Sequence, residues 1–204
     1  MPGSSLWLVP PESSELYRVC HELILKQVPS ACLVDQPTHF TPHITLTADL
    51  MLQGLEGSTA QQWLDRLTLP YGETLRVPIR EVEVGRVFFK KITMRCEKTS
   101  GLCELAAMCR AACVDGLGEA GAMKWVEQSY LPHLSLMYSD LPPDEVQGKM
   151  IEVNKEIQEA KQRNPGSTST DGGAIWLVPT YKPIAEWQPV AKRELSGAEW
   201  EWQT

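Results

Sequence analysis

Apolar and polar side chains alternate along several short segments of this chain, which is the pattern of strands that bury one face. The clearest alternation covers residues 92–97, and we predict strands over 75–84 and 87–97, joined at Gly85. Residues 6–9 are continuously apolar and are followed by two prolines, so they are expected to form a buried strand. Because half-buried strands belong to sheets with one covered face, we expect an antiparallel or mixed sheet.

Other segments carry apolar residues at helical spacing, so helices are predicted between the strands. A first helix is expected over 12–27, stopped by Pro29, and a second over 101–117, followed by a glycine-rich exit at Gly116, Gly118 and Gly121. A capping box of Ser58 and Gln61 predicts a short helix, and a Glu/Lys-rich helix is expected from Pro142-Pro143 to about 163. Residues 164–173 are rich in Ser, Thr and Gly and predict a mobile loop.

Two segments share one form, Pro42-His43-Ile44-Thr45-Leu46 and Pro132-His133-Leu134-Ser135-Leu136. Successive side chains of a strand point to opposite faces, so in each segment the histidine and the hydroxyl residue share one face and the apolar pair shares the other. This pattern predicts a site with two histidines. The alternative is a pair of amphipathic strands with unrelated surface histidines.

The two ends of the chain echo each other, because residues 175–179 repeat the Trp-Leu-Val-Pro pattern of residues 6–10. Together with the two histidine segments, this echo suggests two similar halves related by a pseudo-two-fold axis. Such an arrangement would bring His43 and His133 to opposite sides of one cleft. We therefore expect residues 1–204 to form a single domain of two interleaved lobes.

Composition and charge narrow the classes of partner. The 204 residues are 43% hydrophobic and 22% charged, which is typical of a soluble globular protein. No apolar stretch is long enough for a membrane span and no leader is visible, so an intracellular monomer without membrane insertion is expected. The net charge of −7 disfavours long nucleic acids, whereas a small phosphorylated substrate stays compatible with it.

The six cysteines include no C-x-x-C pair, which argues against a zinc ribbon or a thioredoxin-like centre. Cys109 and Cys113 are four residues apart within an apolar helical pattern and are expected to be buried hydrophobes. His21 is expected in a helix and His39 in a loop, so histidines are too few for a metal site. We expect neither a metal nor another cofactor.

With these segments the chain resembles the two-histidine (2H) phosphoesterase superfamily, and most closely the fungal cyclic phosphodiesterases. The resemblance rests on residues 5–10, 40–45, 89–98 and 132–140, and on Glu186-Trp187. It implies a bilobal α+β fold, with antiparallel sheets that line a central cleft and helices outside. It also implies metal-independent opening of ADP-ribose 1″,2″-cyclic phosphate, a by-product of tRNA splicing, and of nucleoside 2′,3′-cyclic phosphates to 2′-phosphates. A cytoplasmic or Golgi-associated location follows from the same resemblance.

The chemistry fits these residues, because histidine exchanges protons near neutral pH and hydroxyls donate to phosphoryl oxygens. By resemblance, His43 is the general acid and His133 the general base, although the sequence does not fix this order. Thr45 and Ser135 would bind phosphate, and Trp7 and Tyr138 would stack on the base or shape the pocket. Three cations, Lys90, Lys91 and Arg95, are either phosphate ligands or solvated charges of an edge strand.

Two other functions stay open at this point. One is an RNA-end phosphoesterase acting on oligonucleotide 2′,3′-cyclic phosphates or 2′-5′ linkages, which would be expected to carry a basic groove. The other is a catalytically silent module that binds nucleotides.

Overall fold

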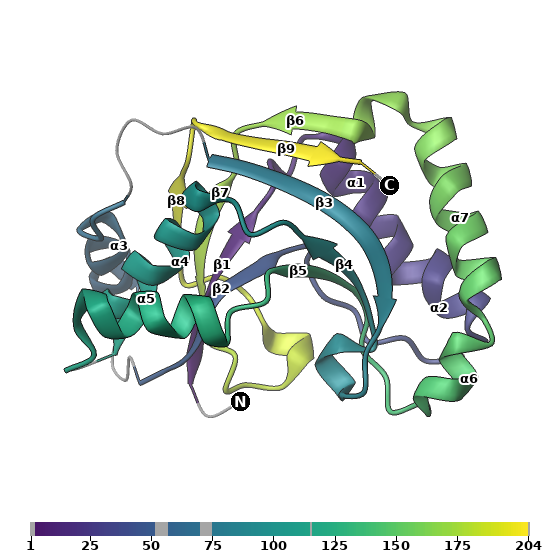
Figure 1. The fold of residues 1–204 in the computed structure, drawn as a ribbon, viewed down its shortest axis with the longest axis horizontal. Helices are drawn as coiled ribbons and strands as arrows, with labels where there is room; N and C mark the ends of the chain where they lie inside the picture. The colour runs from purple at the N-terminus through teal and green to yellow at the C-terminus, as the bar shows by residue number, and fades with distance from the viewer. Residues whose placement is uncertain (1–2, 52–56, 70–74, 115, 204) are drawn as a thin grey trace.

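The strands form one curled, mixed sheet, seen in a computed structural model that describes residues 3–51, 57–69, 75–114 and 116–203 (Figure 1). Its order is β6-β9-β3-β4-β5-β2-β1-β7-β8. All neighbours run antiparallel except β3 and β9, so the sheet differs from the purely antiparallel sheets implied by the resemblance. The strands are β1 (Ser4–Val9), β2 (Ile44–Leu50), β3 (Leu75–Val84), β4 (Ile92–Cys96), β5 (His133–Met137), β6 (Ser169–Asp171), β7 (Ala174–Val178), β8 (Ala191–Glu194) and β9 (Ala198–Trp202).

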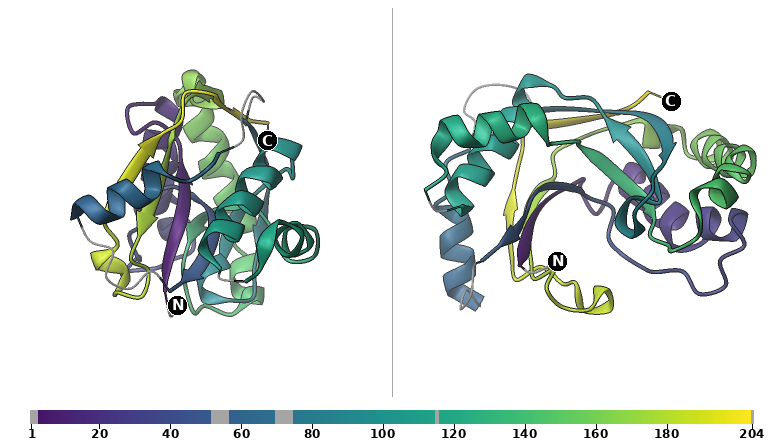
Figure 2. Two further views of the ribbon diagram at one scale, coloured as in Figure 1. Left: turned by 90° about the vertical axis from the view of Figure 1, so that its left-hand side faces the viewer. Right: turned by 60° about the horizontal axis from the view of Figure 1, so that its bottom comes forward.

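The helices gather at the two ends of the curled sheet (Figures 1 and 2). At one end lie α3 (Gly57–Asp65), α4 (Ser100–Cys113) and α5 (Gly118–Gln128); at the other lie α1 (Glu15–Glu22), α2 (Val28–Ala31), α6 (Pro143–Gln147) and α7 (Met150–Arg163). The protein is therefore of the α+β class, as expected. Within the described ranges, no helix has the length and apolar character needed to cross a membrane.

The first helical segment continues past the proline that was expected to stop it. Ser14 caps α1, accepting a hydrogen bond of 3.1 Å from the Tyr17 backbone N–H. A π-helical turn, Leu23–Gln27, links α1 to α2, and Pro29 falls in the first turn of α2. The ring is tolerated there because a first-turn residue needs no N–H donor and the wider turn relieves the clash with the preceding carbonyl. The expected stop at Pro29 is therefore wrong.

The glycine-rich exit predicted after the second helix contains a further helix, α5. Gly116 and Gly118 have φ values of 74° and 63°, so they make the left-handed turn that separates α4 from α5. Gly121 lies inside α5, where an added Cβ would press against the Leu117 side chain. Sequence reasoning missed this helix because glycine breaks isolated helices, whereas here close packing against Leu117 favours it.

Several boundaries differ from the predicted ones. Residues 88–90 form a 3₁₀ turn, so β4 begins only at Ile92, and the helix after Pro142-Pro143 divides into α6 and α7. The segment 164–173 holds a 3₁₀ turn and β6, which pairs with β9, while its mobility stays a prediction. The capping box at Ser58 lies outside the described side chains. The alternation over 92–97 is confirmed, except that Thr93 is also buried.

The centre of the sheet is where the two histidine strands meet. β2 and β5 are neighbours that pair at Ile44 and Leu134, whose side chains are fully buried in the core. The two strands of the Trp-Leu-Val-Pro echo, β1 and β7, also pair with each other, with Trp7 opposite Trp176. Both therefore lie on the β2 side of the sheet, and the sequence echo does not place one in each half. The division into two related lobes stays a prediction.

Candidate active site

Strand register brings the histidines and hydroxyls of both segments onto one face. Ile44 lies opposite Leu134 in an antiparallel pair, so continuing the register sets His43 beside Ser135 and Thr45 beside His133. Each of these two cross-strand pairs continues onto a further strand. Trp7 of β1 lies opposite Thr45, and Thr93 of β4 lies opposite Ser135. The intervening apolar row faces the core. The four predicted side chains are therefore neighbours at the middle of the sheet.

The proline before each histidine fixes the orientation of the imidazole ring. Nδ1 of His43 lies 2.6 Å from the Thr41 carbonyl oxygen, and Nδ1 of His133 lies 2.7 Å from that of Leu131. A carbonyl can only accept, so each Nδ1 carries a hydrogen and each neutral ring keeps Nε2 as its free acceptor. The residue before a proline is held extended, which directs its carbonyl back to the histidine two positions on. Both segments thus present Nε2 in the same way.

Burial makes both imidazoles harder to protonate, and to different degrees. Burial lowers the pKa of His43 from 6.5 to about 3; the Thr41 hydrogen bond opposes this, and His133 lowers it further. Burial also lowers the pKa of His133, with the Leu131 hydrogen bond in opposition and the charge of Lys90 adding to the depression. His43 is 5% exposed, whereas His133 is only partly buried. As the pH falls, His133 therefore takes up a proton before His43.

Aromatic rings hold His43 from two sides. The Trp7 ring stacks on the His43 ring with centroids 3.7 Å apart and 12° between the planes, and Phe40 meets it edge-on at 6.4 Å. Trp187 packs edge-on against Trp7 with a centroid distance of 5.7 Å. Trp7 is almost fully buried, so the ring face toward His43 is not open to a nucleobase. Its contact supports a role in positioning His43.

The hydroxyl of Ser135 has hydrogen-bond partners on either side of it. Ser135 Oγ donates to the Phe89 carbonyl oxygen at 3.1 Å. Burial raises the pKa of Tyr138, and its hydrogen bond to Ser135 partly offsets this. Tyr138 also stacks on Phe40 with centroids 3.7 Å apart, so it holds Ser135 and forms a wall of the site.

A cavity of about 290 Å³ opens over these residues. It is lined by the two histidines, Thr45 and Ser135, and by the aromatic walls from Trp7, Tyr138 and Trp187. Its size is close to the lower end of small-ligand sites, about 300 Å³. A second, more open groove of about 650 Å³ continues beyond His133 across β4 and β3, and it shares Lys90, Leu131 and His133 with the cavity. The arrangement suits a ligand of nucleotide size.

The structure separates the three cations that the sequence left equivalent. Lys91 is buried and donates to the Leu141 carbonyl oxygen at 2.5 Å, away from the cavity. Arg95 pairs with two glutamates, at 2.7 Å from Glu81 and 3.2 Å from Glu83. Lys90 alone of the three lines the cavity that holds both histidines. It is therefore the candidate phosphate ligand of this segment.

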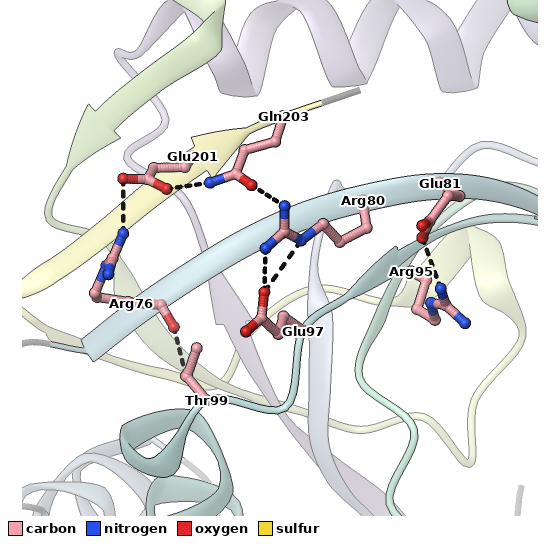
Figure 3. A network of polar contacts seen from close by, with 8 residues as sticks. All are labelled: Arg76, Arg80, Glu81, Arg95, Glu97, Thr99, Glu201 and Gln203. Carbon is pink, nitrogen blue, oxygen red and sulfur yellow. Dashed lines mark hydrogen bonds and ion pairs between the residues drawn. The ribbon is translucent and has the colours of Figure 1, made fainter.

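Ion pairs also neutralise the groove beyond His133. Figure 3 shows Arg95 of β4 paired with Glu81 of β3, and Arg80 of β3 paired with Glu97, the residue that follows β4. Gln203 connects Arg80 to Glu201 on β9, which in turn pairs with Arg76. The network ties the three strands together and leaves this groove with mixed charge. It is not the basic track expected of an enzyme that grips a long RNA.

Some cavity residues were missed by sequence reasoning. Arg110 on α4 and Trp125 on α5 line the cavity, and Phe89 supplies the carbonyl that holds Ser135. Arg110 had one usable signal, since it is the one cation in a helix otherwise made largely of small and apolar residues. Trp125 had none, because its helix was not predicted.

The six cysteines are free, and burial raises the pKa of each thiol, with Cys103 shifted least strongly. Cys109 is fully buried as predicted, whereas Cys113 is partly exposed. Among the residues that the structure describes, no three His, Cys, Asp or Glu side chains come together as a possible metal site.

Comparison with known proteins gives a family for this site and fold. A family model described as cyclic phosphodiesterase-like protein matches residues 1–195. A Phaeosphaeria nodorum protein named 2′,3′-cyclic-nucleotide 3′-phosphodiesterase is 38% identical over 199 residues, covering 96% of this chain and 100% of the relative. A Neurospora crassa protein of the same name is 33% identical, over 96% of this chain and 100% of the relative. A Saccharomyces cerevisiae protein of that name is 25% identical, over 92% of this chain and 98% of the relative. The chain therefore belongs to the cyclic phosphodiesterase-like protein family.

Proposed function

We propose that this protein hydrolyses small cyclic phosphodiesters without a metal: nucleoside 2′,3′-cyclic phosphates to 2′-phosphates, and ADP-ribose 1″,2″-cyclic phosphate to ADP-ribose 1″-phosphate. The observation that carries the proposal is the pairing of two Pro-His segments at the sheet centre, each with Nε2 free and a hydroxyl beside it. The names of the relatives support the cyclic-nucleotide part.

Hydrolysis of a nucleoside 2′,3′-cyclic phosphate needs one base and one acid on opposite sides of the phosphorus. In the proposed reaction one histidine removes a proton from water as its oxygen bonds to phosphorus. The bond from phosphorus to O3′ breaks, and the other histidine gives its proton to O3′. Thr45, Lys90 and Ser135 bind the non-bridging oxygens, for which the Ser135 hydroxyl turns away from Phe89.

Burial supports one assignment of the general acid and the general base to the two histidines. The reaction requires one charged and one neutral imidazole, and a single proton shared by this pair resides mainly on the less buried His133. His133 is therefore the acid and His43 the base, which reverses the order implied by family resemblance.

The RNA-end alternative is less well supported. Arg80 and Arg95 in the open groove are paired with glutamates, and the net charge is −7. A long phosphate chain would meet few unpaired cations there.

Hydrolysis of adenosine 2′,3′-cyclic phosphate tests the proposal directly. The wild type is expected to release adenosine 2′-phosphate, identified by phosphorus NMR. His43→Ala and His133→Ala should each lower turnover by about 10² to 10⁴ while the far-UV circular dichroism stays unchanged. His39→Ala, at an exposed loop position, is the matched control. Binding without turnover in the wild type would favour the silent module, and turnover confined to oligonucleotides would favour the RNA-end enzyme.

A further inference from the structure

Arg110 lines the cavity and is fixed there by contacts to two other elements, β2 and α5. It extends from the last turn of α4, and its Nη1 lies 3.1 Å from both Thr47 Oγ1 and the Ala48 carbonyl oxygen on β2. Its guanidinium carbon lies 4.8 Å from the centre of the Trp125 ring on α5. The side chain is therefore held in one position before any ligand arrives, which reduces the entropy cost of binding.

The charge of this guanidinium has no ion-pair partner among the described residues, and Asp49 is the one carboxylate that lines the same cavity. Within the described ranges Arg110 has no ion pair with a carboxylate, and its two Nη1 acceptors are neutral oxygens. Its Nε is buried and has no hydrogen-bond partner there. Buried donors are normally paired, so the protein leaves the hydrogen-bonding capacity of this guanidinium incompletely used. A guanidinium fork matches phosphate oxygens well.

The position of Arg110 relates it to the reacting phosphate. Its partner Thr47 lies two residues beyond Thr45 on β2, across a register shift between the pairs Trp7–Thr45 and Leu6–Thr47, and both threonines line the cavity. Lys90, in contrast, acts on His133 at the other side of the cavity. An anion held by Arg110 would thus share the cavity with a phosphate held by Thr45.

We propose that Arg110 forms a subsite for a second phosphate group of the substrate. The ADP-ribose cyclic phosphate proposed above is one such substrate, because its ribose carries both the cyclic phosphodiester and a phosphate ester on the 5-position oxygen. This inference rests on the proposed function, and it predicts which small cyclic phosphates are preferred. Trp125 and Thr47 are positioning residues, because they hold the guanidinium.

The test compares two substrates that differ only at the subsite, adenosine 2′,3′-cyclic phosphate with and without a 5′-phosphate. The wild type should show the lower KM for the 5′-phosphorylated compound. Arg110→Met should lower kcat/KM for that compound by roughly 10- to 100-fold, and should change kcat/KM for the other by less than roughly threefold. Arg110→Lys should restore part of the difference.

Arg193→Met is the matched control. Arg193 donates to the carbonyl oxygens of Leu64, Asp65 and Leu67 and does not line the cavity, so its loss removes a comparable structural contact. It should affect both substrates equally. Equal loss for both substrates in Arg110→Met would overturn the subsite and leave Arg110 as a tie between α4 and β2.

A binding experiment separates the subsite from the proposed activity. Calorimetry with adenosine 2′,5′-bisphosphate and adenosine 2′-phosphate should show tighter binding of the bisphosphate to the wild type, and no such preference in Arg110→Met. If the wild type hydrolysed neither cyclic compound, the proposed function would fail, whereas the bisphosphate preference would still decide the subsite. Equal affinities in the wild type would reject it.

Discussion

The indole ring of Trp7 lies flat against the imidazole ring of His43, 3.7 Å away and tilted by 12°. Both side chains are buried, and the His43 ring is also held by its Nδ1 contact to the Thr41 carbonyl oxygen. The hydrogen bond alone would still let the imidazole ring of His43 tilt about the line from Nδ1 to the Thr41 oxygen, and the stacked Trp7 ring restricts that motion. The sequence predicted Trp7 as a base-stacking residue or pocket wall, and the geometry makes it a support for His43, the proposed reacting group.

Replacing Trp7 should therefore affect turnover more than substrate binding. Trp7→Leu removes the stacked ring and is expected to lower kcat by about 10- to 100-fold with little change in KM, because small misplacements of a reacting group are costly. Trp7→Phe should retain most activity. Steady-state kinetics provides the measurement. Trp176→Phe is the control, since Trp176 lies opposite Trp7 and is also buried but stacks under Lys192. A rise in KM with unchanged kcat would instead indicate direct contact with substrate.

The acid role of His133 predicts rescue by a better leaving group. In a cyclic nucleotide with sulfur in place of O3′, the thiolate departs without a proton, so His133→Ala should lose much less activity than on the oxygen substrate. His43→Ala should lose about the same on both, because water still needs a base. The rates of thiol release, followed with a thiol reagent, decide which histidine is the general acid. Rescue of His43→Ala instead would assign the acid role to His43.

Acid should destabilise the fold through His43. In the unfolded chain this histidine takes up a proton near pH 6.5, whereas in the folded protein its pKa is about 3, so stability present above pH 6.5 is lost as the pH falls toward 3. From about pH 7 to about pH 5 the expected loss is about 2 kcal/mol of unfolding free energy. Urea unfolding of His43→Gln should lack this component. His39→Gln, at an exposed site, should behave as the wild type.

Removal of divalent metals should leave activity unchanged, because the proposed acid and base are both imidazoles. The measurement is kcat/KM on adenosine 2′,3′-cyclic phosphate before and after exhaustive dialysis against a chelator. A loss of activity that zinc or magnesium restores would reject the metal-independent mechanism.

The turn before β4 should be sensitive to a single methyl group. A Cβ at Gly85 would overlap the Lys90 carbonyl oxygen, and this turn also carries the Phe89 carbonyl that holds Ser135. Gly85→Ala is expected to cost about 1 to 3 kcal/mol of stability and to lower kcat, as measured by urea unfolding and kinetics. Gly197→Ala is the control, because a Cβ there would contact nothing within 4 Å. Equal stability of the two variants would contradict the close packing of this turn.

The sequence by itself determined the chemistry of the site and most of its supporting strands. His43, Thr45, His133 and Ser135 could be read from two short segments because alternation in a strand is a local property that needs no distant contact. The proline before each histidine likewise acts locally on the carbonyl that orients the ring. The β3 strand and the buried face of α1 followed from apolar periodicity in the same way.

Only the tertiary structure decided how the segments meet and which neighbours matter. The pairing of β2 with β5 joins residues about ninety positions apart, and long-range pairing leaves no local signal. The low pKa of His43 comes from burial beneath Trp7 and Phe40. Lys90 is the candidate phosphate ligand because other contacts occupy Lys91 and Arg95. The position of Arg110 depends on the packing of α4, α5 and β2 against one another. Desolvation, ion pairing and the reach of a side chain depend on atoms brought together by folding. The residues proposed to perform the chemistry can therefore be identified from the chain, whereas the environment that assigns their roles cannot.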